Sequence, residues 1–279
     1  MATSEDQNEN RPVTTADIDA FRRTYFERAD YMYWYDRLMW AWRRHAELKR
    51  PENKARQLVD AYSIYMQCVE IMLINMNSLM VPRERFLRSL TIDNFKIREF
   101  GQKVLDDRDL LRKFTKNGIY QLRNEQPTEA ELNFDVSTLR ECIQDYLKNY
   151  NFLNSYKHGF RVNSASGPNF MAFGKGGGPT FKLFEGDSQL TYYDFRKDDG
   201  VQSMYETTIY FKHSRVFGKS LFTIIYLMNM RLFTLRGLGD TRRYKRPFFI
   251  IYDKEDWDNA FGDGRWSKGL FSFVKRSQE

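Results

Sequence analysis

The polar run Asn154-Ser155-Tyr156-Lys157-His158-Gly159-Phe160-Arg161 combines residue types that can bind an anion and move a proton. A neutral imidazole at His158 can accept a proton from a ribose hydroxyl, while Lys157 or Arg161 neutralises charge on a phosphate. Because nearby cations disfavour the protonated imidazole, His158 is expected to be a neutral base at about pH 7. This chemistry requires no metal ion and no other cofactor.

One amphipathic helix over residues 135–159 is predicted to position these groups. At about 100° per residue, Asn154 falls in line with the apolar residue Ile143, and Lys157 and His158 flank that line. Burying such groups without partners costs several kcal/mol, so either they have partners or the stripe opens into a cleft. The alternative is a structural helix end, where the cations satisfy the last carbonyl groups.

The run resembles the signature of the HEPN superfamily of helical-bundle proteins. Many members are metal-independent ribonucleases of antiviral defence and toxin–antitoxin systems, and others have lost catalysis. The signature is an arginine, a polar residue that is often asparagine, three further residues and a histidine. Asn154 and His158 match the polar residue and the histidine, whereas Leu153 occupies the position of the arginine. The resemblance covers residues 15–160.

The resemblance implies an RNA-directed protein of the defence or toxin type, with metal-independent ribonuclease activity. His158 would be the general acid–base, Asn154 would orient it, and Lys157 or Arg161 would replace the absent arginine. That absence favours a second hypothesis, a non-catalytic binding or regulatory protein that uses the polar cluster as a ligand or assembly site. A structural subunit of a larger complex is a third, because the first helix is rich in aromatic residues.

A second group of cations follows the last long helix. These side chains could track a phosphate backbone, with Tyr244 and Phe248 stacking on bases. The alternative is a solvated helix end whose arginines complement the helix dipole. The net charge of +7 favours acidic partners. The predicted nucleic-acid-binding residues are Arg236, Arg242, Arg243, Lys245 and Arg246.

Other segments carry weaker signals. The glycine run at residues 174–178 lacks the order of a phosphate-binding loop, so it is predicted to be a connector. The acidic clusters at residues 106–109 and 253–258 are interpreted as helix caps. With two cysteines and three histidines, no metal site and no cofactor are expected.

Hydrophobic periodicity predicts the α+β class: an N-terminal helical bundle followed by an antiparallel-sheet module with a long helix. The aromatic stretch at residues 31–42 suggests that more than one face of the first helix is covered. The predicted parts are a disordered lead at 1–14, a helical bundle domain at 15–160, a Gly/Ser-rich linker at 161–180 and an α+β domain at 181–279. The predicted helices span residues 17–48, 52–80, 93–105, 107–116, 135–159 and 214–235, residues 125–133 form a loop, and strands span 181–184, 189–195, 201–211 and 247–252.

The sequence also leads to expectations about the localisation of the protein and its partners. Residues 1–10 have neither the basic nor the apolar region of a signal peptide. The apolar segments at 61–82 and 221–230 are interpreted as buried core helices, because the first contains polar side chains and the second is too short to span a bilayer. A cytoplasmic protein without membrane contact is expected. Its expected partners are RNA or another anionic ligand, and a second copy of the chain or another protein.

Overall fold

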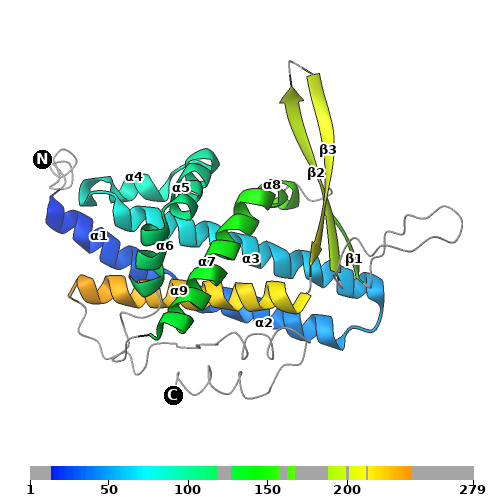
Figure 1. The fold of residues 1–279 in the computed structure, drawn as a ribbon, viewed down its shortest axis with the longest axis horizontal. Helices are drawn as coiled ribbons and strands as arrows, with labels where there is room; N and C mark the ends of the chain where they lie inside the picture. Colours follow the sequence, from blue (N-terminus) through cyan, green and yellow to red (C-terminus); the bar gives the residue numbers. More distant parts are fainter. Residues whose placement is uncertain are drawn as a thin grey trace, which may run out of the picture.

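The computed structural model describes residues 14–117, 127–157, 162–166, 188–198, 201–211 and 213–239. It confirms the α+β class, because a bundle of helices is joined to an antiparallel sheet (Figure 1). The helices are α1 (Thr15–Arg28), α2 (Tyr31–Glu47), α3 (Pro51–Met80), the short 3₁₀ helix η1 (Arg83–Arg85), α4 (Phe86–Leu90), α5 (Asn94–Asp106), α6 (Arg108–Thr115), α7 (Glu129–Asn149), α8 (Asn151–Lys157) and α9 (His213–Gly237). The strands are β1 (Val162–Ser166), β2 (Ser188–Asp198) and β3 (Val201–Phe211).

The first predicted helix is wrong in one respect, because residues 17–48 form two helices and not one. The chain leaves the helical conformation at Ala29, and Asp30 caps the start of α2 by accepting a hydrogen bond from the Tyr33 amide at 3.3 Å. An aspartate in this position satisfies a backbone donor that has no partner within the helix. The direction of the chain can therefore change between α1 and α2.

Buried Asn75 of α3 forms hydrogen bonds to both helices that flank this break, α1 and α2. Its side-chain amide donates to the Tyr31 hydroxyl at 2.7 Å, and its carbonyl oxygen accepts from the Tyr25 hydroxyl at 3.1 Å. Because Tyr25 belongs to α1 and Tyr31 begins α2, one buried side chain fixes both helices against α3. These bonds also offset the cost of burying an amide.

The helix predicted at residues 135–159 starts earlier and is interrupted. Thr128 and Glu131 form a reciprocal capping box, so α7 begins at Glu129 inside the segment predicted as a loop. The helix ends at Asn149, and α8 resumes from Asn151. The helices predicted at 52–80, 93–105, 107–116 and 214–235 are confirmed as α3, α5, α6 and α9.

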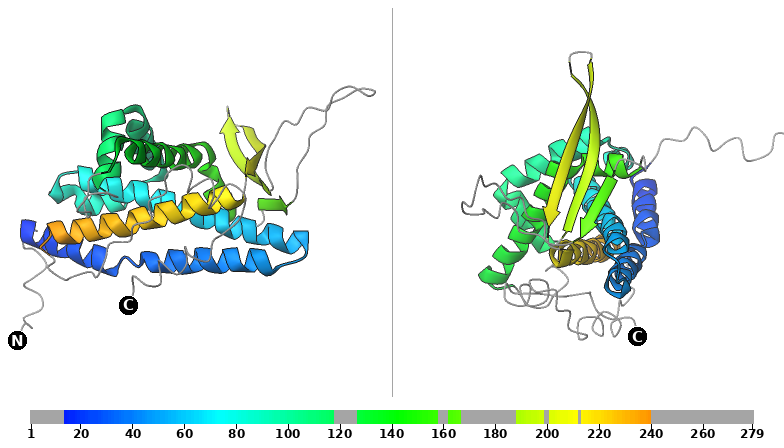
Figure 2. Two further views of the ribbon diagram at one scale, coloured as in Figure 1. Left: turned by 60° about the horizontal axis from the view of Figure 1, so that its bottom comes forward. Right: turned by 90° about the vertical axis from the view of Figure 1, so that its right-hand side faces the viewer.

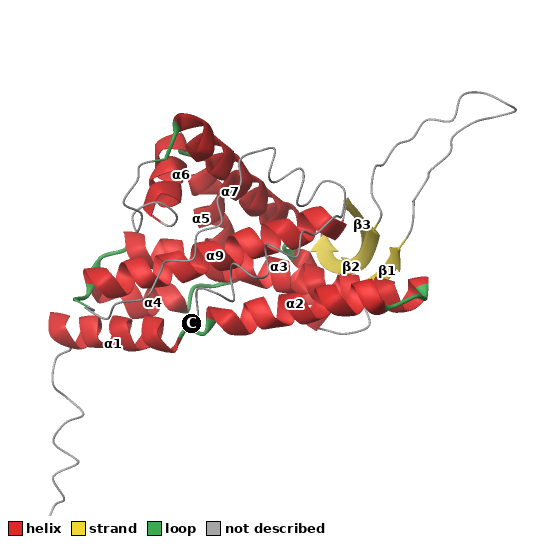
Figure 3. Cartoon of the chain, turned by 90° about the horizontal axis from the view of Figure 1, so that it is seen from below, coloured by secondary structure: helices red, strands yellow, loops and turns green. Residues whose placement is uncertain are grey.

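Helix α9 packs in the middle of the bundle. It contacts α3 along much of its length, with α2 on one side and α7 on the other (Figures 2 and 3). Its buried residues, among them Phe217, Ile224 and Leu227, share one core with Tyr65 and Leu73 of α3. Among the described helices, α9 is the one long and apolar enough to cross a membrane, but 78% of its most apolar window is buried inside the protein.

The sheet has the antiparallel order β1-β2-β3. Strand β1 corrects the prediction that residues 161–180 are wholly linker, because Val162 pairs with Tyr192 and Ser166 pairs with Ser188. The base of the sheet joins the helical core, since the rings of Tyr62 and Phe211 stack at 5.4 Å. The far end of the β2–β3 hairpin rises away from the bundle (Figure 1). The strands predicted at 181–184 and 247–252 lie outside the described residues, as does the rest of the linker.

Candidate functional site

Two of the four predicted HEPN-like residues, Asn154 and Lys157, lie within α8. The backbones of Asn154 and Lys157 belong to this helix, but their side chains are not among the described parts of the chain. His158 and Arg161 lie outside the described residues. The geometry that these four groups adopt together therefore stays a prediction.

The position of the family arginine is described, and it faces the core. Leu153 has an exposed fraction of 3% and belongs to the main hydrophobic cluster, beside Phe152. Ser155 on the same short helix is also buried. A charged side chain at position 153 would need partners that the apolar surroundings do not offer.

Tyr156 anchors the end of α8 to α3. Its hydroxyl donates a hydrogen bond to Asp60 at 3.3 Å. Burial raises the pKa of the Asp60 carboxyl, and the hydrogen bond from Tyr156 and the charge of Arg37 partly oppose that rise. The end of α8 is therefore held against α3, the second helix of the α2–α3 hairpin.

The outer face of α2 carries aromatic side chains in contact with water. Trp40 has an exposed fraction of 59%, and Tyr33 is also exposed. The guanidinium of Arg37 lies 5.7 Å from the centre of the Tyr33 ring and 5.6 Å from that of Trp34. The expectation that more than one face of this segment is covered is confirmed for the rest of α2, whose aromatic residues pack against the core. The face formed by Tyr33, Arg37, Trp40 and Arg44 lies at the surface and is called the α2 ridge.

The part of the hairpin around its turn is basic, and the acidic Asp36 and Asp60 lie on either side of it. Residues 37–56 contain seven Lys and Arg residues but only two carboxylates, Glu47 and Glu52. One arginine of the ridge, Arg44, lies 3.9 Å from Glu47, and both side chains are largely in water. Such an exposed pair is weak and leaves Arg44 able to bind another anion. Beyond the ridge, the cations of the hairpin are Arg43, Lys49, Arg50, Lys54 and Arg56, called the hairpin cations below.

The predicted nucleic-acid-binding run at the end of α9 is not next to the α8 motif. Arg236 is exposed near the C-terminal end of α9, whereas α8 lies near the N-terminal end. The rise of about 1.5 Å per residue separates the two ends of this helix by more than about 30 Å. Arg231, five residues earlier on α9, donates to the carbonyls of Phe26 and Glu27, so it caps the end of α1. The remaining predicted residues, Arg242, Arg243, Lys245 and Arg246, lie outside the described part of the chain.

An ionic network centred on buried Lys219 lies between α3, α7 and α9. Lys219 Nζ is 2.8 Å from Asp145 Oδ2 and 3.1 Å from Glu141 Oε2. The Tyr65 hydroxyl donates to the same Asp145 oxygen at 2.8 Å, and Arg215 lies 2.8 Å from Glu141. Sequence reasoning missed this cluster because Asp145 and Lys219 are 74 positions apart.

The pKa shifts of Lys219 and Glu141 reflect the attraction between the charges of this network. Burial would lower the pKa of Lys219, but the charges of Asp145 and Glu141 outweigh it and raise the pKa. Burial likewise opposes ionisation of Glu141, yet Lys219 and Arg215 lower the pKa of its carboxyl. Burial raises the pKa of the neighbouring Cys142 thiol to about 11, so this thiol stays protonated and unreactive. The network is therefore a structural tie and not a source of a nucleophile.

A stack of rings joins α2 to the start of α9. The His213 ring lies 4.9 Å from Trp42 at an angle of 5°, and its centre is 4.0 Å from that of His45. Burial, followed by the charges of His45 and Lys54, lowers the pKa of His213 to about 3. This imidazole is therefore neutral at physiological pH and serves as a packing ring.

Within the described residues, no group of three or more His, Cys, Asp or Glu side chains is placed to hold a metal ion. Among the described residues, an arrangement that can act on an external ligand is the exposed α2 ridge with the hairpin cations. Compared with known proteins, the chain matches no protein family, no curated protein sequence and no solved structure.

Proposed function

We propose that the protein is RNA-directed and binds single-stranded RNA along the α2 ridge and the hairpin cations. The observation that carries this proposal is the exposure of Trp40, at 59%, between two arginines on one helix face. A large apolar ring in water is costly unless a partner covers it. Unpaired bases are suitable partners, since any base can stack on an indole.

The spacing of the ridge fits a nucleic-acid strand. Tyr33, Arg37, Trp40 and Arg44 recur at four, three and four positions, so rings and guanidinium groups alternate along a single face. The rings accept bases, and the guanidinium groups bind the phosphates that join them. The hairpin cations extend this positive surface, so the protein should bind RNA through its phosphates without sequence preference.

The proposal includes a catalytic form, in which the HEPN-like motif acts on RNA that extends from the ridge past α3 to α8. Tyr156 bonds to Asp60, which is also under the charge of Arg37 on the ridge. His158 follows Tyr156 by two residues. In the catalytic form of the proposal, His158 accepts the proton of a ribose hydroxyl, Asn154 orients the imidazole, and Lys157 or Arg161 neutralises the phosphate.

The second candidate function is RNA binding without cleavage. The observation that favours it is the burial of Leu153 at the position where the resembling family carries its arginine. No arginine can act from this position without leaving the core. In this form the protein regulates or protects RNA, and the polar cluster at the end of α8 contributes only to binding or assembly.

Binding is tested with a labelled single-stranded RNA at low salt. Stacking of one base contributes about 1–3 kcal/mol, so Trp40→Ala should weaken binding by about 5- to 150-fold. Phe95→Ala is the matched control, because Phe95 has the same exposed fraction of 59% but lies on α5. Equal loss in both variants, or no binding by the wild type, would contradict the proposal.

The ionic part of binding is tested by its salt dependence. Each phosphate contact to a single strand adds about 0.7 to the slope of log K against log salt, so Arg44→Ala should lower the slope by about 0.7. Arg85→Ala, an exposed arginine in η1, should leave the slope unchanged. A slope that responds equally to both substitutions would show that binding is not localised to the ridge.

Cleavage is tested separately with EDTA present, because the proposed chemistry needs no metal. Loss of RNA cleavage in His158→Ala, with unchanged binding and melting temperature, supports the catalytic form. Binding without cleavage by the wild-type protein supports the second candidate. If His158→Ala unfolds the protein, the histidine has a structural role and the catalytic assignment fails.

A further inference from the structure

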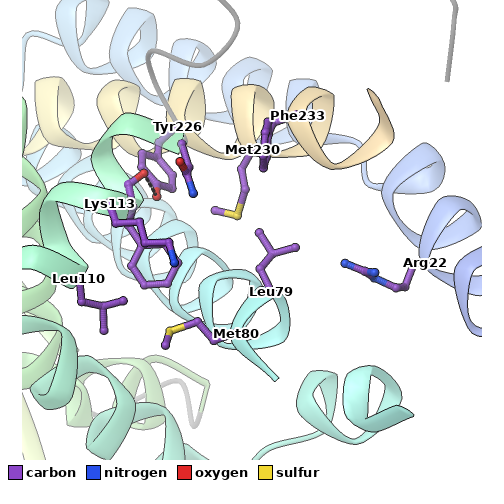
Figure 4. A pocket seen from close by; sticks show the side chains of 10 residues that line it. Arg22, Leu79, Met80, Leu110, Lys113, Tyr226, Met230 and Phe233 are labelled. Atoms are coloured by element: carbon purple, nitrogen blue, oxygen red, sulfur yellow. Dashed lines mark hydrogen bonds between the residues drawn. The ribbon is translucent and has the colours of Figure 1, made fainter. Parts of the chain in front are cut away.

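A pocket of about 450 Å³ lies between α1, α3, α6 and α9, away from the α2 ridge (Figure 4). This size is typical of sites that enclose a small molecule. Most of its described wall is apolar, and two of the side chains are thioethers, which adapt to ligands of different shape. The apolar lining residues are Leu79, Met80, Leu110, Phe114, Met230 and Phe233.

One side of the pocket carries an available cation. Lys113 of α6 is exposed and forms no ion pair with any described residue. Asn117 lines the pocket four positions further along the chain, close to one helical turn away. An ammonium group and a side-chain amide on the same side can both donate to one carboxylate.

The other polar lining residues, Tyr226 and Arg22, already interact with the protein, although the buried Nε of Arg22 donates no hydrogen bond. The Tyr226 hydroxyl donates to the Phe114 carbonyl at 2.9 Å, so only its ring faces a ligand (Figure 4). Arg22 lies at the opposite end of the pocket from Lys113. Its guanidinium is 3.6 Å from Asp19 and 5.2 Å from the centre of the Phe86 ring. Because Asp19 already balances the charge of Arg22, an anionic head group is expected at Lys113.

We infer that this pocket binds an aliphatic carboxylate of the fatty-acid type, with its head group on Lys113 and Asn117 and its chain along Leu79 and Met230. The apolar wall accommodates the chain, and the single uncommitted cation complements a single negative charge. Arg22, which is paired with Asp19, closes the far end of the pocket. The length of the fatty-acid chain is therefore limited, because burying its terminal methyl group against this ion pair would not be favourable.

Chain-length dependence tests the apolar part of the site. The full chain is titrated calorimetrically with hexanoate, octanoate, decanoate and dodecanoate below their micelle concentrations. Each buried methylene contributes about 0.8 kcal/mol, so two added carbons should tighten binding about 15-fold until the chain reaches Arg22. Affinity that is absent for all four acids, or independent of length, overturns the inference.

Substitutions test the head-group site. Lys113→Met should weaken decanoate binding about tenfold while leaving 1-decanol binding unchanged, and the exposed neighbour Lys116→Met is the matched control. Leu79→Trp, which fills the pocket from a half-buried position, should abolish binding of both ligands. In methyl NMR spectra, decanoate should shift Met80 and Met230 and not buried Met39 of α2. Equal loss of acid and alcohol in Lys113→Met, or shifts at Met39 alone, would place the ligand elsewhere.

Discussion

Replacing Lys219 by methionine tests the role of the ionic network most directly. The substitution keeps the length of the side chain but removes the charge between Asp145 and Glu141. Asp145 loses its cation and, among the described residues, keeps the Tyr65 hydroxyl as its donor, whereas Glu141 keeps Arg215 at 2.8 Å. We therefore expect the loss of stability to come from uncompensated negative charge more than from lost packing.

The size of the effect follows from burial. Removing one partner of a fully buried ion pair costs about 3–5 kcal/mol. The side chains of Asp145 and Glu141 keep exposed fractions of 35% and 41%, so water compensates part of this loss. We expect Lys219→Met to lower the free energy of unfolding by about 2–3 kcal/mol, which corresponds to a melting temperature about 4–12 °C lower.

Denaturant unfolding at neutral pH measures this difference. Exposed Lys148 on α7 is the matched control, and Lys148→Met should change stability by less than about 0.5 kcal/mol. Adding Asp145→Asn to Lys219→Met should recover about 1 kcal/mol, because the stranded charge disappears while Tyr65 can still donate. If Lys219→Met behaves like Lys148→Met, the network does not stabilise the bundle.

The pH dependence of this difference has a defined sign. The pKa of Lys219 is raised in the folded state, so its contribution is complete below the unfolded value of 10.5 and disappears as pH rises through the folded value. The pKa of Glu141 is lowered, so its contribution is present above 4.5 and disappears as pH falls through the folded value. The gap between wild type and Lys219→Met should be widest between these limits.

Three further predictions concern stability. Burial lowers the pKa of His213 from 6.5 to about 3, so the free energy of unfolding of the wild type should fall by about 1.4 kcal/mol per pH unit below pH 6.5. The variant His213→Phe keeps a ring stacked on Trp42 and should not show this loss. Thermal melts of both proteins between about pH 7.5 and 4.5 measure the difference, and parallel curves would refute the prediction. Leu153→Arg places an arginine where the HEPN signature has one, and it should lower the free energy of unfolding by more than about 3 kcal/mol without creating ribonuclease activity. A stable and active variant would show that the side chain at this position can leave the core. Thr128→Ala should cost about 1 kcal/mol by removing the capping box with Glu131, and an unchanged urea midpoint would mean that the start of α7 does not depend on it.

Periodic apolar residues were enough to predict most of the helices. Pro51 and Pro82 bracket α3 in the sequence, and Asp198-Asp199-Gly200 separates the two long strands, so these elements follow from local signals. The start of α7 also had a local signal, the Thr128–Glu131 capping box, which was outweighed by Pro127 next to it. Proline before the cap is compatible with a helix that begins after it.

Other features depend on partners distant in the chain. The break after α1 could not be predicted, because helical periodicity continues through it and the stabilising amide of Asn75 comes from another helix. Strand β1 consists of Val-Asn-Ser-Ala-Ser, which has little strand preference of its own and forms by pairing with β2. Sequence alone cannot supply such contacts.

The candidate site was predictable only in part. The sequence gives the aromatic residues of α2 and the cations beside them, but not that Trp40 faces water while Trp42 packs inward. Two residues apart on a helix, their side chains differ by about 200° in direction, so a small error in the assumed face reverses the interpretation. The motif around His158 has a clear sequence pattern, but its chemistry depends on side-chain positions that only tertiary structure fixes.

The central position of α9 also has a consequence for how the chain is made. Helices α2 and α3 leave the ribosome early, yet the helix that covers their apolar faces begins at His213. At a translation rate of about 5–20 residues per second, the apolar faces of α2 and α3 stay uncovered for on the order of ten seconds before α9 is synthesised. During that interval the nascent chain is a substrate for chaperones that recognise exposed apolar helices. A nonsense mutation or a truncated transcript that ends translation before α9 is therefore expected to give aggregated or degraded protein, and not a shorter folded bundle.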